Sequence, residues 1–178
     1  MQLRAYRPAD CAATLALFTN TVRKVNAADY TWLHGTADAV RWGQSQLLHH
    51  TLVATEADQL VGFGDMDDTG YLDRLFVHHL FLHRGIATAL VAKLELYARS
   101  HDILQATTHA SITTKPFFEQ RGYVVVTAQQ VVRQGMLYKI MSCKKSCHRC
   151  QKAKLHPHKI KEADTFEKKP DSQPCNEP

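Results

Sequence analysis

Hydrophobic and polar positions repeat with two different periods along residues 1–141. Leu3 and Ala5 alternate with polar neighbours, which indicates a short first strand. From Pro8 to Val25, apolar residues recur at steps of three and four, which predicts a helix that buries one face. The same analysis predicts the remaining elements: a helix over 36–48 with Thr36 as its N-cap, strands at 52–56, 60–65 and 71–77, a helix over 84–100, a strand at 105–108, a helix over 115–121, and a last hairpin of 123–132 with 136–141.

The order of these elements is β-α-α-β-β-β-α-β-α-β-β, so the fold class is a mixed α/β fold. Three strands between residues 52 and 77 are separated by short turns, which predicts an antiparallel meander at the centre of the chain. From residue 142 the periodicity disappears, and Pro, Lys, Ser and His dominate. We therefore expect one folded domain over residues 1–141 and a basic, disordered tail with Cys and His over residues 142–178.

Composition agrees with one globular domain and argues against a membrane protein. The chain has 178 residues, of which 44% are apolar and 22% are charged. Its longest apolar runs, such as Val124–Val126, are too short to span a bilayer. The first eight residues lack the apolar run of a signal peptide. We expect a cytoplasmic protein with no membrane partner.

The positive charge is concentrated in the tail. Residues 141–178 carry nine Lys and Arg against five Asp and Glu, which is about +4 of the total of +5. The body is nearly neutral, so any argument for nucleic-acid binding would rest on the tail alone, and we expect no nucleic-acid partner.

The cysteines favour neither a disulfide scaffold nor a metal site. Cys11 lies in a helical pattern, and the other four cysteines lie at or beyond residue 143. A secreted disulfide scaffold would spread them through its core. Cys143, Cys147 and Cys150 have spacings that occur in zinc sites, but no second pair follows and Cys175 is isolated. The sequence therefore predicts no metal site.

One segment has the pattern of a phosphate-binding loop. The strand that ends Leu75-Phe76-Val77 is followed by His83-Arg84-Gly85-Ile86-Ala87-Thr88, which opens a helix. Small residues at Gly85 and Ala87 leave the first backbone N–H groups unobstructed, and Arg84 adds a full positive charge to the helix dipole. These groups suit a pyrophosphate. The glycine and lysine spacings of P-loops and of dinucleotide-binding folds are absent, and the alternative is an ordinary helix start with a convenient glycine.

The segment Arg84-Gly85-Ile86-Ala87 resembles the acetyl-CoA loop of GNAT-type N-acetyltransferases, whose pattern is Gln/Arg-x-x-Gly-x-Gly/Ala. Leu82 stands where that family usually has Gln or Arg. A second stretch, residues 111–123 with Pro116-Phe117-Phe118-Glu119, resembles the YafP-like bacterial branch of the family. The resemblance covers residues 1–141 in the order of elements that the family has.

The resemblance implies a mixed sheet of about seven strands with about four helices, splayed between the fourth and fifth strands, and acetyl-CoA as co-substrate in the cleft. It also implies which residues hold acetyl-CoA: the backbone of Leu75, Phe76 and Val77 for the pantetheine arm, the N–H groups of Arg84, Gly85, Ile86, Ala87 and Thr88 for the pyrophosphate, Ser111 at the position of the family's Asn, and Phe118 at the position of its usual Tyr.

Acetyl transfer to an amine requires a base, because an ammonium group has no lone pair to attack with. Asp73 is the candidate, since residues 71, 73 and 75 of a strand share one face and the family often places an acid there. The alternative role for Asp73 is a salt bridge to Arg74 or Arg121. Asp65 and Glu56 on the preceding strands are the next candidates for the base, and His78 ranks below them.

The proton for the departing thiolate has no obvious donor. Phe118 cannot donate a proton, so the donor is Tyr123, Tyr138 or a water molecule, or the thiolate leaves unassisted. Trp32 and Trp42 flank the segment that faces the acceptor in this fold, together with His34 and residues 26–30. These aromatic and polar residues suit a small amine or a peptide end, whereas packing of the large rings is the alternative.

The sequence thus predicts an N-acetyltransferase that acts on a primary amine of a small molecule or peptide. The rival interpretation is a catalytically degenerate acyl-CoA-binding module whose basic tail contacts nucleic acid or an acidic partner. Leu82, Ser111 and Phe118 favour the rival, whereas Gly85, Ala87 and Asp73 favour the enzyme.

Overall fold

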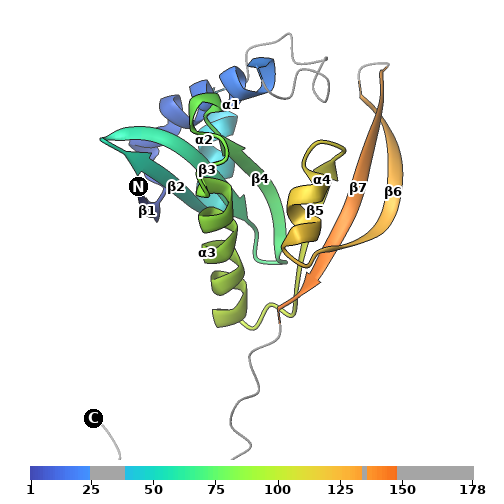
Figure 1. Cartoon of the computed structure of the whole chain (residues 1–178). Helices are drawn as coiled ribbons and strands as arrows, with labels where there is room; N and C mark the ends of the chain where they lie inside the picture. The colour runs from blue at the N-terminus through green and yellow to red at the C-terminus, as the bar shows by residue number, and fades with distance from the viewer. Residues whose placement is uncertain (25–38, 134–135, 148–178) are drawn as a thin grey trace, which may run out of the picture.

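The structure, a computed structural model, describes residues 1–24, 39–133 and 136–147 (Figure 1). The elements follow the predicted order: β1 Gln2–Ala5, α1 Cys11–Lys24, α2 Ala39–Leu48, β2 His50–Glu56, β3 Gln59–Met66, β4 Tyr71–Val77, α3 Ile86–Ser100, β5 Gln105–Ser111, α4 Lys115–Gln120, β6 Val124–Arg133 and β7 Met136–Ser146. The predicted cap Thr36, residues 26–30, Trp32, His34 and the tail cysteines Cys150 and Cys175 lie outside the described residues.

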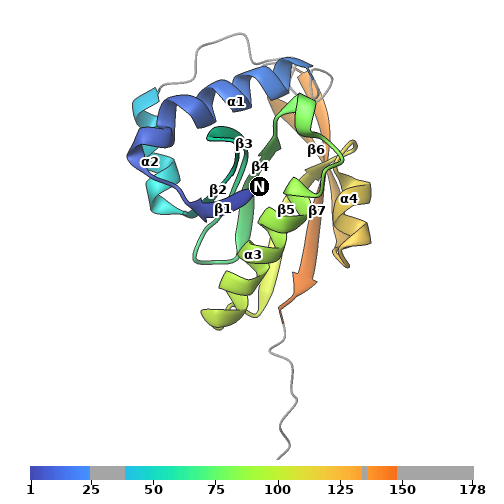
Figure 2. The same cartoon turned by 60° about the vertical axis from the view of Figure 1, so that its left-hand side comes forward.

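The seven strands form one mixed sheet in the order β1-β2-β3-β4-β5-β7-β6, with helices on both faces (Figures 1 and 2). On one face, α1 and α2 cover a core that contains Phe18, Phe63 and Phe76. On the other face, α3 and α4 cover a larger core that contains Leu90 and Leu94. Burial of these apolar stripes holds the helices on the sheet. No helix within the described ranges is long and apolar enough to cross a membrane.

The sheet opens between β4 and β5, its one parallel pair. Within the described residues these strands pair at Tyr71 with Thr107 and at Leu72 with Thr108, and no further pair follows. These two pairs form the vertex of the opening, and beyond them the two strands diverge, as Figure 1 shows. The predicted splay between the fourth and fifth strands is therefore confirmed, and it leaves one edge of β4 without a strand partner.

A β-bulge lies at Asp73. Arg74 pairs with Asp65 on β3, whereas the next pair joins Leu72 to Met66, so Asp73 is the extra residue. A bulge shifts the alternation of side chains along a strand. The expectation that residues 71, 73 and 75 share one face is therefore wrong: Asp73 faces Asp65 and His49, whereas Leu75 packs against the core under α3.

The last strand runs five residues further than the sequence predicted. It ends at Ser146 instead of Met141, and residues 142–146 pair with residues 105–109 of β5. Cys143 and Cys147 are 1% and 4% exposed, because alternate residues of this stretch point into the core. The polar composition of residues 142–147 hid this alternation, since cysteine is a small apolar residue when it is buried. The expected boundary between domain and tail falls inside β7 and moves beyond residue 146.

Candidate active site

A cavity of about 200 Å³ fills the opening between β4 and β5. Leu82 and Ala87 line its wide end at the start of α3, and Leu72 and Thr108 line its narrow end at the vertex. Its floor includes Phe118 of α4. The cavity therefore connects the predicted pyrophosphate loop to the point where the two strands join.

The loop before α3 has the geometry that an anion needs. Gly85 is the N-cap of α3 and has φ +78°, a left-handed conformation that favours glycine. A Cβ at Gly85 would meet nothing within 4 Å, so the backbone is open to a ligand on that side. Ile86 is 2% exposed and anchors the helix start, and the Arg84 guanidinium lies 4.8 Å from the Phe81 ring. The N–H groups of the first turn have no acceptor within their own helix, which suits a pyrophosphate.

Asp73 lines the cavity from the bulge, close to the vertex. Its side chain is 42% exposed, and one carboxylate oxygen lies 3.4 Å from Arg74 Nε. The predicted contact with Arg74 is therefore present. Arg121, the other predicted partner, lies 3.1 Å from Glu95 instead. Asp73 therefore lines the cavity and contacts Arg74 at the same time.

Arg74 connects Asp73 to the buried acid beneath it. Its Nε lies 2.6 Å from Asp65 Oδ2, a close ion pair without the alignment of a hydrogen bond. Its Nη1 donates to Ser45 Oγ at 2.9 Å, and its guanidinium lies 5.2 Å from the centre of the Trp42 ring. These contacts from α2 and β3 fix the guanidinium, and with it the position of Asp73.

Asp65 is fully buried, and burial raises its pKa to about 6 despite the opposing attraction of Arg74. The negative charge of Asp73 contributes to the same increase in pKa. The Nδ1 atom of His49 lies 3.5 Å from Asp65 Oδ1. Asp65 is not among the residues that line the cavity. Its carboxylate lies beside Arg74 and His49 instead.

The two remaining candidates for the base lie away from the bulge. Glu56 pairs with Gln59 at the turn between β2 and β3, whereas Asp65 lies at the other end of that hairpin. His78 Nδ1 accepts a hydrogen bond from the Leu80 N–H at 3.3 Å, and burial lowers the pKa of His78. Among the predicted candidates within the described residues, Asp73 alone lines the cavity.

Of the residues predicted around the leaving group, Phe118 and Ser111 line the cavity, whereas Tyr123 does not. Phe118 is 3% exposed and lines the cavity, and Ser111 lines it with a hydroxyl 3.2 Å from that of Thr114. Tyr123 does not line the cavity. It is 2% exposed, and burial together with Glu95 raises its pKa. Tyr138 is placed by its backbone, on β7.

Trp42 is a core residue. Its ring lies 4.8 Å from that of Phe18 and 5.9 Å from that of Phe63, and its indole N–H donates to Thr14 Oγ1 at 3.0 Å. The packing alternative is therefore correct for this residue. Trp42 also packs against the guanidinium of Arg74, so it contributes to the site through Arg74.

Sequence reasoning did not single out His109, which lines the cavity on β5. Strand β5 extends to Ser111 instead of ending at Thr108, and its residues alternate between buried and accessible. The alternation of Ala106, Thr108 and Ala110 with polar neighbours could have indicated that His109 faces outward.

A family model described as an acetyltransferase (GNAT) domain matches residues 32–145. The chain is 34% identical over 139 residues to the uncharacterized N-acetyltransferase YafP of Escherichia coli K12. The aligned region covers 76% of this chain and 89% of that protein. The chain belongs to the GNAT family of acetyltransferases. The predicted resemblance to its YafP-like branch is thereby confirmed.

Solved structures of GNAT enzymes have the same fold. A GCN5-related N-acetyltransferase from Rhodopseudomonas palustris superposes with a TM-score of 0.76 at 29% identity and covers 82% of this chain and 94% of that one. The putative acetyltransferase yncA from Salmonella typhimurium, solved with acetyl-CoA, superposes with a TM-score of 0.68 at 18% identity and covers 88% of this chain and 99% of that one. As a GNAT enzyme, the chain is an N-acetyltransferase with acetyl-CoA as its co-substrate.

Proposed function

We propose that acetyl-CoA lies in the cavity between β4 and β5 and that Asp73 is the base that prepares the acceptor amine. The first-turn N–H groups from Arg84 to Thr88 hold the pyrophosphate. The pantetheine arm follows the free edge of β4, along Leu75, Phe76 and Val77, and passes Ser111 and Phe118. The thioester then reaches the vertex beside Asp73. The cavity supports this path because it runs from Ala87 to Leu72 without interruption.

The chemistry begins with the acceptor as an ammonium ion. The Asp73 carboxylate takes one proton from it, which exposes the nitrogen lone pair. The nitrogen attacks the carbonyl carbon of the thioester, a C–N bond forms, and the negative charge moves to oxygen. A backbone N–H at the bulge of β4 is suited to hold this oxyanion. As the nitrogen gives up its second proton, the carbonyl re-forms, the C–S bond breaks and coenzyme A leaves as the thiolate.

The acceptor in this proposal is a primary amine of a small molecule or a peptide. The Asp73 side chain is 42% exposed and lines the cavity, so its carboxylate can attract a cationic group. The proposal also places the enzyme in the cytoplasm, where acetyl-CoA is available.

The observation that carries the proposal is that Asp73 lines the cavity at the bulge and keeps a side chain that is 42% exposed. The test measures release of free thiol from acetyl-CoA with a panel of polyamines, amino acids, aminoglycosides and peptides. We expect turnover with at least one class and a 10²- to 10⁴-fold loss in Asp73→Asn, the usual contribution of a positioned base. The matched control is Asp58→Asn, in the exposed turn after β2.

The rival binding module predicts a different result. It would bind acetyl-CoA and release no thiol with any amine. An Asp73→Asn variant that turned over at the rate of the wild type would reassign the base, while the family and the co-substrate would stand.

A further inference from the structure

Two ionisable side chains line the cavity among the described residues, one on each of the two diverging strands. Asp73 follows the last paired residue of β4, and His109 follows the last paired residue of β5. The transfer of an acetyl group from a thioester to an ammonium ion removes two protons from nitrogen, and one base before the attack accounts for only the first. The second proton leaves after the C–N bond has formed.

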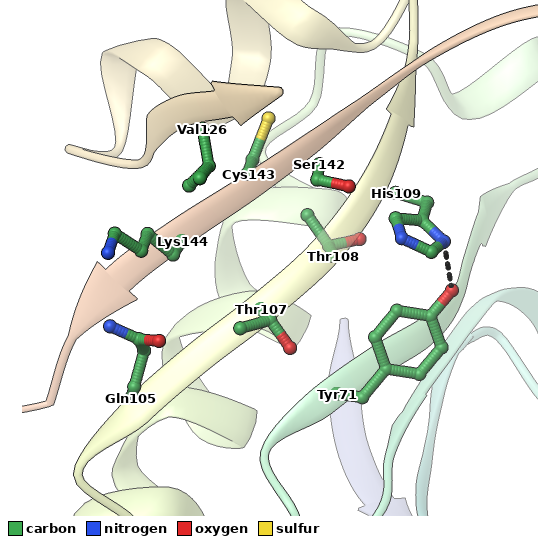
Figure 3. A pocket seen from close by; sticks show the side chains of 9 residues that line it. All are labelled: Tyr71, Gln105, Thr107, Thr108, His109, Val126, Ser142, Cys143 and Lys144. Carbon is green, nitrogen blue, oxygen red and sulfur yellow. Dashed lines mark hydrogen bonds between the residues drawn. The ribbon is translucent and has the colours of Figure 1, made fainter. Parts of the chain in front are cut away.

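His109 lines two cavities. It lines the acetyl-CoA cavity, and it also lines a second cavity of about 370 Å³ on the face of β5 and β7 (Figure 3). Its neighbour across β7 is Ser142. The charged and titratable groups that share these cavities with it are Tyr71 and Asp73 on β4 and Cys143 and Lys144 on β7. His109 therefore borders the cavity proposed for acetyl-CoA, next to the residue pair at which the sheet opens.

A hydrogen bond orients the imidazole. His109 Nδ1 and the Tyr71 hydroxyl are 3.1 Å apart, and the other ring nitrogen points away from Tyr71 (Figure 3). In the Nδ1–H tautomer, Nδ1 donates to Tyr71 Oη and Nε2 is an unprotonated acceptor. A hydroxyl can donate or accept, so the tyrosine fixes the direction of the ring, and a proton-accepting Nε2 requires this tautomer.

We propose that His109 Nε2 takes the second proton from the acceptor nitrogen and passes it to the departing sulfur, with Tyr71 as the residue that positions the ring. This inference rests on the proposed function. After the C–N bond forms, the nitrogen gives its proton to Nε2 and the ring becomes an imidazolium. The C–S bond breaks with its electron pair on sulfur, and the imidazolium returns the proton to the thiolate. The products are the amide and free coenzyme A, and the proton on Asp73 passes to solvent.

The structure leaves this role open for His109. Phe118 stands at the position of the family's tyrosine and has no proton to give, and Tyr123 lies in the core outside the cavity. Imidazole is the side chain that both accepts and donates a proton near neutral pH.

The test compares His109→Ala with His101→Ala, an exposed histidine at the end of α3. We expect His109→Ala to lose about 10²-fold in kcat, the lower end for a positioned acid–base group, and to keep its affinity for acetyl-CoA. Added imidazole should restore part of the rate, which a structural role for the ring would not allow. His101→Ala should turn over like the wild type.

A second measurement uses ¹⁵N chemical shifts of the histidine rings at neutral pH. We expect the Nδ1–H tautomer for His109 in the wild type and a loss of that preference in Tyr71→Phe. A folded His109→Ala variant with wild-type turnover, a loss that imidazole does not rescue, or an Nε2–H tautomer would overturn this inference and leave the proposed function standing. Absence of thiol release from the wild-type protein with every amine would overturn both.

Discussion

At the scale of single residues, the site depends on the Asp73 carboxylate, which the bulge in β4 places beside the ion pair of Arg74 with Asp65. Asp73 touches Arg74, and Arg74 touches Asp65, which is fully buried. The sequence identified Asp73 as the candidate base, but it could not predict the bulge, because a bulge depends on the register with β3. The sequence also could not show that Asp65 is fully buried and paired with Arg74.

The first residue-scale prediction concerns the pair of Arg74 with Asp65. Removal of one partner leaves an uncompensated charge in the core, so Arg74→Met should lower the free energy of unfolding by about 3 kcal/mol. The double variant Arg74→Met with Asp65→Leu should recover most of that loss, since it removes the buried charge as well. Urea denaturation of the two variants and the wild type measures both effects. Equal losses in the single and double variants would contradict the assignment of the buried pair.

The second residue-scale prediction concerns pH. The folded protein holds the pKa of Asp65 near 6, above its ordinary value of 3.8, so between these values the folded state binds more protons than the unfolded state. Stability from this group is complete below the ordinary value and falls as pH rises toward 6, by about 3 kcal/mol in total. Urea denaturation from pH 4 to 7 should therefore show the wild type losing stability relative to Asp65→Asn. A constant difference between the two proteins across this range would refute the raised pKa.

At the scale of elements, the sequence predicted each described helix and strand, because apolar periods of two and of three to four residues are local signals. It was wrong about the end of β7, since Cys143 and Cys147 do not read as core residues within a run of Lys and Ser. The loop before α3 was predicted from its glycine, and the φ of +78° at Gly85 gives the physical reason for that glycine.

The element-scale prediction for this loop uses two substitutions at one position. Gly85→Asn keeps a residue that tolerates a left-handed backbone and adds no charge, whereas Gly85→Glu adds a negative charge among the proposed phosphates. We expect Gly85→Glu to weaken acetyl-CoA binding at least tenfold and Gly85→Asn to weaken it much less, both by calorimetry. Equal affinities in folded Gly85→Glu and wild type would place the pyrophosphate elsewhere.

The element-scale prediction for β7 compares two truncations. A chain that ends at Met141 loses the residues that pair with Gln105–His109 and two buried cysteines, so it should fail to give a cooperative unfolding transition. A chain that ends at Cys147 keeps all of these contacts and every proposed site residue, and it should bind acetyl-CoA like the full chain. Circular dichroism melts and calorimetry distinguish the two. A stable domain ending at Met141 would show that the end of β7 is dispensable.

At the scale of the whole molecule, two pieces of sheet meet along a short seam. Strands β1 to β4 form one piece and β5 to β7 the other, and within the described residues two residue pairs join them, at Tyr71 and Leu72. The core under α3 supplies the remaining connection. A sequence pattern can indicate seven strands, but the position at which parallel pairing stops depends on contacts between segments that are far apart in the chain, so the splay came from the family resemblance and not from periodicity.

This seam predicts how acetyl-CoA should change the molecule. A co-substrate that fills the cavity bridges β4 to β5 and stabilises the folded state by about 2.7 kcal/mol at a concentration of 100 times its Kd, which corresponds to a rise in Tm of roughly 5–10 °C.

Because the free edge of β4 gains the pantetheine arm as its partner, hydrogen exchange should slow most in residues 73–77, in residues 84–88 of the loop and in residues 109–114. Strand β1, at the far edge of the sheet, serves as the internal control and should exchange at an unchanged rate. Coenzyme A without the acetyl group should protect the same segments, since the pyrophosphate and the arm supply these contacts. If protection appeared instead on the open face of β6 and β7, with residues 73–77 unaffected, the co-substrate would lie outside the cleft, and the catalytic assignments to Asp73 and His109 would fall with that position.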